Sequence, residues 1–130
     1  FVGDQGFQMN VQELQFIAQH RLPIAIVILN NESSGMIKDR EAMAGYTYSL
    51  HTTKDSGYGI PDFSALAKAY GISWFRADSD FLLGGIIEPM MIELLIPDNQ
   101  ILTPSLPRGR DMQDLEPRLD NLKYNKLNAL

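Results

Sequence analysis

The sequence predicts an α/β domain in which helices cover both faces of a parallel β-sheet, a three-layer sandwich. The stretch "LPIAIVILNN" at residues 22–31 is a continuous, largely β-branched apolar run, which is typical of a central strand buried on both faces. Before it comes a segment with apolar residues at helical spacing, and before that the apolar pair that opens the chain. A strand, a helix and a strand within about thirty residues form a right-handed βαβ unit.

The first half of the chain supplies the helix and the central strand of this unit. Residues 10–20 predict an amphipathic helix, because the apolar residues between Val11 and Ala18 recur at helical spacing. We expect Asn10 to cap its N-terminus, with Glu13 three residues later completing a capping box. The following strand has its core between Ile24 and Leu29.

Two more helices are predicted in the middle of the chain. Residues 33–43, "SSGMIKDREAM", predict a short helix, and residues 44–60 form a long polar loop of the kind that is often functional or mobile. Residues 61–71, "PDFSALAKAYG", predict a clearer helix. Pro61 stands at its start and Gly71 at its end, the asymmetry typical of helix termini.

The remaining elements are two strands, one helix and a tail. Residues 72–77, "ISWFRA", and residues 90–96, "MMIELLI", predict strands, and we expect residues 79–88 to be helical in spite of two adjacent glycines. From Pro97 onward the composition becomes proline-bearing and mixed in charge. We therefore expect one domain over residues 1–96 and a Pro-rich tail over residues 97–130 that packs by single anchors.

Composition excludes several classes of function. The formal charge is −5 and the isoelectric point about 4.8, whereas a nucleic-acid-binding surface usually shows clustered Lys and Arg. The chain has no Cys, which excludes disulfides and thiolate metal sites. Its longest apolar run has 8 residues, too few to span a membrane. Since we find no signal-peptide pattern, we expect a cytoplasmic protein. The chain opens inside an apolar element, as a piece of a longer protein would.

Polar side chains follow the first two predicted strands. Asp4 comes directly after Phe1-Val2-Gly3, and the pair Asn30-Asn31 follows the central strand. In open parallel sheets, ligands bind outside the carboxyl ends of the strands. A carboxylate and an amide oxygen there suit Mg²⁺ or Ca²⁺, and the helix N-terminus expected at residues 6–10 suits an anion. Asp and Asn at these positions are also common turn residues.

The two segments "GDQGFQMNVQEL" and "PIAIVILNNESSGMI" resemble the thiamine-diphosphate motif, which runs from Gly-Asp-Gly to Asn-Asn over this distance. The similarity is to the C-terminal, diphosphate-binding domain of acetolactate-synthase-like enzymes. It extends over residues 1–96, through "PDFSALAKAYGI" and "MMIELLI". The motif differs at Gln5, where a Gly is usual, and at Ser33-Ser34, where Gly-Tyr is usual.

This resemblance implies a thiamine-diphosphate-binding fold and a set of ligands. Asp4, Asn31 and the main-chain carbonyl of Ser33 would hold Mg²⁺, and two diphosphate oxygens and a water would complete its octahedron. The N–H groups of Gly6 and Phe7 would meet the phosphates. The cofactor-binding residues that it implies are Gly3, Asp4, Gln5, Gly6, Phe7, Met9, Asn31, Ser33, Gly35 and Met36; Met9 and Met36 would line the wall near the cofactor's rings, and we assign no catalytic residue.

The function implied by the resemblance is part of a thiamine-diphosphate-dependent 2-oxoacid decarboxylase or carboligase of acetolactate-synthase type, acting on a substrate such as pyruvate. The pyrimidine end of the cofactor would be held by a different domain of a second chain, in a homodimer or tetramer. The chain alone would then be inactive. Two alternatives are a simple decarboxylase of another 2-oxoacid and a non-catalytic, partner-binding domain that kept the fold.

Overall fold

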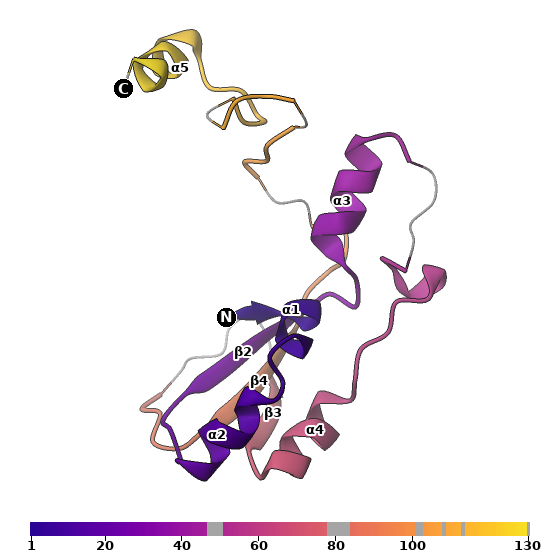
Figure 1. Ribbon diagram of the computed structural model, residues 1–130, viewed down its shortest axis with the longest axis vertical. Helices are drawn as coiled ribbons and strands as arrows, with labels where there is room; N and C mark the ends of the chain where they lie inside the picture. The colour runs from indigo at the N-terminus through magenta and orange to yellow at the C-terminus, as the bar shows by residue number, and fades with distance from the viewer. Residues whose placement is uncertain (47–50, 78–83, 101–102, 108, 113, 130) are drawn as a thin grey trace.

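A parallel β-sheet of four strands organises the described part of the chain. The computed structural model describes residues 1–46, 51–77, 84–100, 103–107, 109–112 and 114–129 (Figure 1). The strands lie in the order β1-β2-β4-β3, and every neighbouring pair is parallel. Their bounds are Val2–Gly3 for β1, Ala25–Asn30 for β2, Ser73–Ala77 for β3 and Met90–Leu95 for β4. The predicted parallel sheet is confirmed, with the apolar run of β2 in an interior position.

The main hydrophobic core lies between one face of this sheet and three helices, α1 (Asp4–Gln8), α2 (Glu13–Gln19) and α4 (Phe63–Tyr70). The rings of Phe7 and Phe63 meet edge to face there, with centroids 5.6 Å apart. Because side chains alternate along a strand, the neighbours of the core residues in β2 and β4 point to the opposite face. The buried residues of the core are Phe7, Leu14, Ile28, Phe63, Ala67, Ile72 and Met91.

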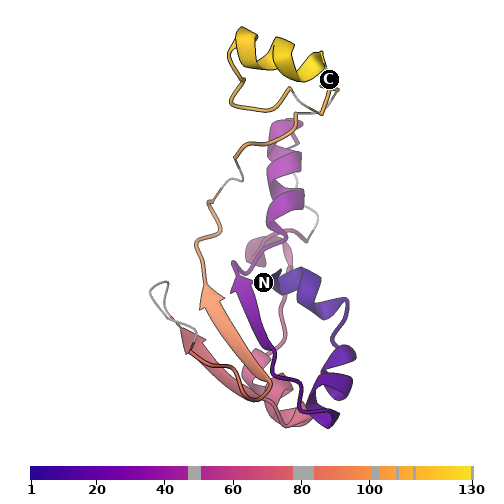
Figure 2. The same ribbon diagram turned by 90° about the vertical axis from the view of Figure 1, so that its left-hand side faces the viewer.

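The opposite face of the sheet carries Val27 and Ile92, which are also buried. The helices of the described part that pack on the sheet all lie on the core face (Figure 2). The second helical layer expected from the sequence is therefore not among the described residues, although the α/β class with a parallel sheet is confirmed.

The first helical region differs from the prediction. Residues 10–20 do not form one capped helix: α1 begins at Asp4, and α2 begins at Glu13 with Gln12 as its N-cap and no side-chain cap. The predicted capping box of Asn10 and Glu13 is wrong. Residues 9–12 form turns that lead directly into α2. The N–H groups of Glu13, Leu14 and Gln15 therefore donate to carbonyls three residues earlier in the chain. These three N–H groups already have backbone partners, so a side-chain cap has little to add at the start of α2.

The next two helices agree with the prediction. The helix α3 spans Gly35–Met43, and α4 ends at Gly71, which adopts the left-handed conformation with φ +71°. The carboxylate of Asp62 caps α4 by accepting the N–H of Ala65 at 3.0 Å. Pro61 precedes this cap, so the first two residues of the predicted helix lie outside it. A short 3-10 helix, η1 (Lys54–Ser56), lies in the long connection between α3 and α4.

The predicted helix over residues 79–88 is wrong for the part that can be compared. Residues 84–88 are not helical, and residues 79–83 lie outside the described residues. Gly84 and Gly85 each cost about 1 kcal/mol relative to Ala in a helix, and Pro89 disfavours the helical conformation of the residue before it. Together these residues oppose a helix more strongly than the surrounding apolar residues favour one.

The C-terminal part leaves the sheet at β4 and contains the helix α5 (Asn121–Asn128). Ser105 and Glu116 form an isolated antiparallel bridge in the intervening segment. In Figure 2 the segment runs past α3, which itself stands beyond the carboxyl ends of β2 and β4. The boundary at residue 96 stays a prediction. Within the described residues, no helix is long and apolar enough to cross a membrane.

Candidate functional site

The first two strands end side by side, as the site hypothesis requires. In the parallel pair of β1 and β2, Gly3 is the partner of Leu29. Asp4 follows β1, and Asn30 and Asn31 stand at and just after the end of β2, so these residues reach the same edge of the sheet. The helix α3 begins just beyond this edge (Figure 1).

Asp4 presents a buried carboxylate at this edge. Its exposed fraction is 3%, and its Oδ1 accepts the N–H of Gln5 at 2.8 Å. Burial raises the pKa of the Asp4 carboxyl, against the opposing effects of the Gln5 N–H, the Tyr58 hydroxyl and the backbone of Ser33 and Glu32. Of these groups only the Gln5 N–H reaches hydrogen-bond geometry, and Oδ2 has no partner among the described residues. The carboxylate therefore faces the turn at Glu32 and Ser33 with free acceptor capacity.

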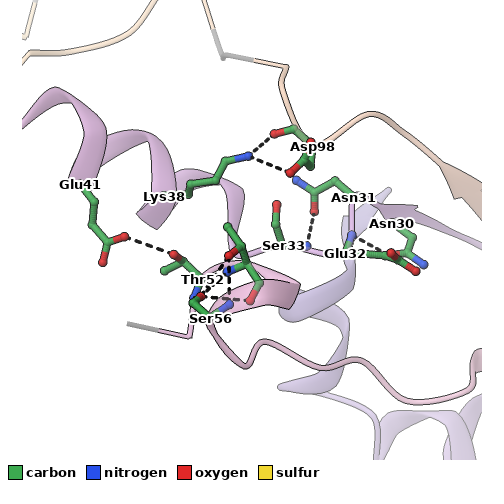
Figure 3. A network of polar contacts seen from close by, with 10 residues as sticks. Asn30, Asn31, Glu32, Ser33, Lys38, Glu41, Thr52, Ser56 and Asp98 are labelled. Carbon is green, nitrogen blue, oxygen red and sulfur yellow. Dashed lines mark hydrogen bonds and ion pairs between the residues drawn. The ribbon is translucent and has the colours of Figure 1, made fainter. Parts of the chain in front are cut away.

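The turn after β2 is held by its own side chains (Figure 3). Asn30 Oδ1 accepts the N–H of Glu32 at 3.0 Å, and Asn31 Oδ1 accepts the N–H of Ser33 at 3.3 Å. Glu32 adopts a left-handed conformation with φ +51°, which is unusual for a residue with a side chain. The hydroxyl oxygen of Ser33 is buried and has no hydrogen-bond partner in the part of the chain that the structure describes. Asp4 and Ser33 thus each bring an unsatisfied buried oxygen to this edge.

Gly35 allows α3 to start against the amide of Asn31. A Cβ atom at this position would lie 2.7 Å from Asn31 Nδ2, closer than real contacts of Cβ atoms. Any larger residue at position 35 would push the Asn31 side chain away. Among the glycines that the resemblance implies for cofactor binding, Gly35 is therefore the one at which a clash with a neighbouring side chain explains the need for glycine.

The two departures from the familiar motif contact each other. The Ser34 hydroxyl donates a hydrogen bond of 2.6 Å to Oε1 of Gln5. This bond joins α1 to the residue before α3, so it connects the two halves of the motif directly. Sequence reasoning treated the two substitutions separately and missed their pairing.

Part of the long loop packs onto the site. The N–H of Ser34 donates to the Thr52 carbonyl at 2.8 Å, and Ser33 pairs with Thr53 in an antiparallel bridge. The Tyr58 hydroxyl is buried, and no described residue forms a hydrogen bond with it. Burial and the adjacent Asp4 carboxylate raise the pKa of Tyr58 to about 12. Tyr58 is a site residue that sequence reasoning missed. Its only signal was an aromatic residue between two glycines in a polar loop.

Three of the implied contacts look different in the structure. The Phe7 side chain is part of the core, so only its backbone can face a ligand. Met9 and Met36 are 72% and 66% exposed, and nothing covers them in the described part of the chain. The helix N-terminus expected at residues 6–10 is wrong, because α1 begins at Asp4 after the extended Gly3. The wider set of cofactor-binding residues stays a prediction.

The donor set at this edge fits a hard cation. It offers a carboxylate, a carboxamide and a main-chain carbonyl, the oxygen ligands that Mg²⁺ takes alongside phosphates and water. The described residues hold no cluster of three or more His, Cys, Asp or Glu that would suit a metal bound by protein alone. An open cleft of about 400 Å³ lies beside the turn, lined in part by Asn31, Glu32 and Asp98. A larger one of about 840 Å³, between α3 and the tail, contains none of the implied ligands.

A known protein family matches most of this chain. The family described as "Thiamine pyrophosphate enzyme, C-terminal TPP binding domain" matches residues 1–93. The chain belongs to this family. The thiamine-diphosphate-binding fold expected from the motif is thereby confirmed, and thiamine diphosphate is the cofactor that the family's description names.

Similar proteins carry the name acetolactate synthase. The chain is 34% identical over 116 residues to the acetolactate synthase large subunit of Pyropia yezoensis, covering 83% of this chain and 19% of that protein. It is 34% identical over 116 residues to the large subunit of Lactococcus lactis, covering 84% and 20%. It is 30% identical over 125 residues to acetolactate synthase 1 of Zea mays, covering 87% and 19%. The chain spans about a fifth of the length of these relatives.

Proposed function

We propose that this chain is the diphosphate- and Mg²⁺-binding domain of a thiamine-diphosphate-dependent 2-oxoacid decarboxylase or carboligase of acetolactate-synthase type. One observation carries the proposal. The buried carboxylate of Asp4 keeps an oxygen that no described residue bonds, at the edge where the Asn31–Ser33 turn lies. An unpaired buried acceptor is costly in the free protein, and a bound cation would satisfy it.

In this proposal three groups hold the metal: the Asp4 carboxylate, the Asn31 amide oxygen and the Ser33 carbonyl. The amide oxygen of Asn31 accepts the Ser33 N–H in the free chain, so its side chain would turn outward on binding. The N–H groups of Gly6 and Phe7 would face the phosphates. The cofactor supplies stabilisation of the negative charge that decarboxylation leaves on the substrate, and the protein supplies binding and orientation.

The relatives are about five times longer than this chain, so the rest of the active site is proposed to come from other domains. A second domain, on a partner chain of a homodimer or tetramer, would hold the pyrimidine end of the cofactor. The substrate would be a 2-oxoacid such as pyruvate. The cytoplasmic location stays a prediction.

The metal assignment is tested by titrating Mg²⁺ and thiamine diphosphate into the intact protein that carries this sequence. Asp4→Ala is expected to abolish binding, and Asn31→Ala to weaken it strongly. Asp111→Ala is the matched control, because Asp111 is an exposed carboxylate in the tail and its loss is expected to leave binding unchanged. Wild-type cofactor retention in purified Asp4→Ala protein would show that the site is misassigned.

The need for other domains is tested with the isolated 130-residue chain. Supplied with pyruvate, thiamine diphosphate and Mg²⁺, it is expected to release carbon dioxide no faster than the free cofactor does. Sustained turnover would mean that the chain holds a complete site. In the intact protein, acetolactate as product supports the carboligase. An aldehyde alone would indicate the simple decarboxylase, and an absence of cofactor binding the non-catalytic domain.

A further inference from the structure

A buried glutamate lies in the middle of the sheet. Glu93 is 3% exposed in β4, between strands on both sides. The register places it in one row with Ile28 of β2 and Arg76 of β3, on the face that carries the hydrophobic core. Burying a charge in such a position is costly unless the charge is paired and hydrogen-bonded.

Two groups satisfy the Glu93 carboxylate. Oε1 accepts a hydrogen bond of 2.7 Å from Asn30 Nδ2, and Oε2 accepts one of 3.1 Å from Nη2 of Arg76. The Arg76 side chain is 56% exposed, so the cation keeps much of its hydration while it compensates the buried charge. The contact to Asn30 is the one that leads toward the site.

The contact with Glu93 sets the orientation of the Asn30 carboxamide. An ionised carboxylate only accepts hydrogen bonds, so the NH₂ group of Asn30 must face Glu93 and its oxygen must face the other way. That oxygen accepts the N–H of Glu32 at 3.0 Å. Asn30 is itself 2% exposed and bonded at both ends.

The anchored N–H belongs to the residue with the least favourable backbone in the turn. Glu32 has φ +51°, a left-handed conformation that is strained for a residue with a side chain. Its two chain neighbours are Asn31 and Ser33, the proposed metal ligands. Releasing this N–H would let the turn relax, and both ligands would move with it.

We propose that Glu93 is a positioning residue for the metal site: through Asn30 it holds the turn that presents Asn31 and the Ser33 carbonyl. The inference rests on the proposed function, because it names the residue that preorganises the proposed ligands. Outer partners of metal ligands typically contribute 10- to 100-fold to metal affinity.

The experiment measures Mg²⁺ affinity by calorimetric titration of magnesium chloride into the intact protein at saturating thiamine diphosphate. In Glu93→Gln the side chain keeps its shape, but one of its polar atoms now donates, so it cannot accept from both Asn30 and Arg76. We expect Mg²⁺ affinity to fall about 10- to 100-fold. Asn30→Ala, which removes the link itself, is expected to give a similar loss, and Glu93→Gln added to it is expected to change affinity no further.

Ile92→Ala is the matched control for general destabilisation. Ile92 is fully buried, next to Glu93 in the same strand but on the opposite face of the sheet. Ile92→Ala is expected to lose at least as much thermal stability as Glu93→Gln and yet to keep wild-type Mg²⁺ affinity.

Three results would overturn the inference: wild-type affinity in Glu93→Gln, an equal loss in Ile92→Ala, or additive losses in the double variant. If Glu93→Gln does not fold, Asn30→Ala decides, since wild-type affinity there also refutes the role. Asp4→Ala distinguishes a failure of the proposed function from a failure of the proposed role of Glu93. If Asp4→Ala retains Mg²⁺ and cofactor, the proposed function fails; if it loses them while Glu93→Gln does not, only the role of Glu93 fails.

Discussion

Replacing Asp4 by Asn is expected to stabilise the metal-free protein and to abolish metal binding at the proposed site. The wild-type carboxylate is almost fully buried, and one of its two oxygens has no hydrogen-bond partner within the described ranges. A buried polar group left unsatisfied costs about 1–3 kcal/mol, and more when it is charged. In Asp4→Asn the amide oxygen keeps the Gln5 N–H, and the new NH₂ group faces the Tyr58 hydroxyl, which can accept from it. We expect the free energy of unfolding to rise by roughly 1–2 kcal/mol at pH 7.

The stability difference between Asp4→Asn and wild type is expected to depend on pH. Burial raises the pKa of Asp4 above its ordinary value of 3.8, so the folded state binds the proton more tightly than the unfolded state does. The penalty for the ionised carboxylate is therefore fully present above the raised pKa. It fades as the pH falls through that value and is gone below 3.8, where both states are protonated. The advantage of Asp4→Asn should shrink over the same range.

The assay is urea unfolding of the metal-free 130-residue chain, followed by the fluorescence of Trp74, its single tryptophan. Asp111→Asn is the control, and at this exposed position we expect a change within about 0.5 kcal/mol. The reasoning is refuted if Asp4→Asn is no more stable than wild type at pH 7, or if its advantage grows on acidification. Titration of Mg²⁺ and thiamine diphosphate into Asp4→Asn should show a loss of binding. The residue that destabilises the free protein would then be one that binding requires.

Three further predictions concern the surroundings of the site. Burial and Asp4 raise the pKa of Tyr58 to about 12, so the difference in tyrosinate absorbance between wild type and Tyr58→Phe should appear only in strong alkali. In Asp4→Asn the ionisation of Tyr58 should occur at lower pH. A midpoint near 10.0 in wild type would contradict this prediction. A double-mutant cycle of Gln5→Ala and Ser34→Ala in urea unfolding should give a coupling of about 0.5–1.5 kcal/mol, whereas additive effects would mean that their hydrogen bond adds nothing. Phe63→Ala should lower the free energy of unfolding by about 3–5 kcal/mol, and a loss below about 1 kcal/mol would show that the core around it is loosely packed.

Local patterns were enough to predict most of the elements. The run from Ile24 to Leu29 identifies β2, because a strand buried on both faces needs apolar residues at successive positions. The Gly at position 71 identifies the end of α4, because only glycine adopts the left-handed conformation there without strain. The pairing of Asp4 with the Asn30-Asn31 turn also followed from the sequence, since a βαβ unit places two parallel strand ends at one edge. In each case the responsible interaction lies within a few residues or follows from one short crossover.

The contacts that complete the site join residues far apart in the chain, and no local pattern contains them. The bond from Ser34 to Gln5 spans 29 positions, and the bond from Asn30 to Glu93 spans 63. The approach of Tyr58 to Asp4 depends on the path of the loop after α3. The absence of a side-chain cap on α2 depends on how the turns at residues 9–12 follow α1. Such contacts arise from strand register, loop path and the filling of buried space, which are properties of the assembled chain. The sequence was therefore enough to propose which residue types would hold a metal, while the groups that orient them became visible only once the chain was packed.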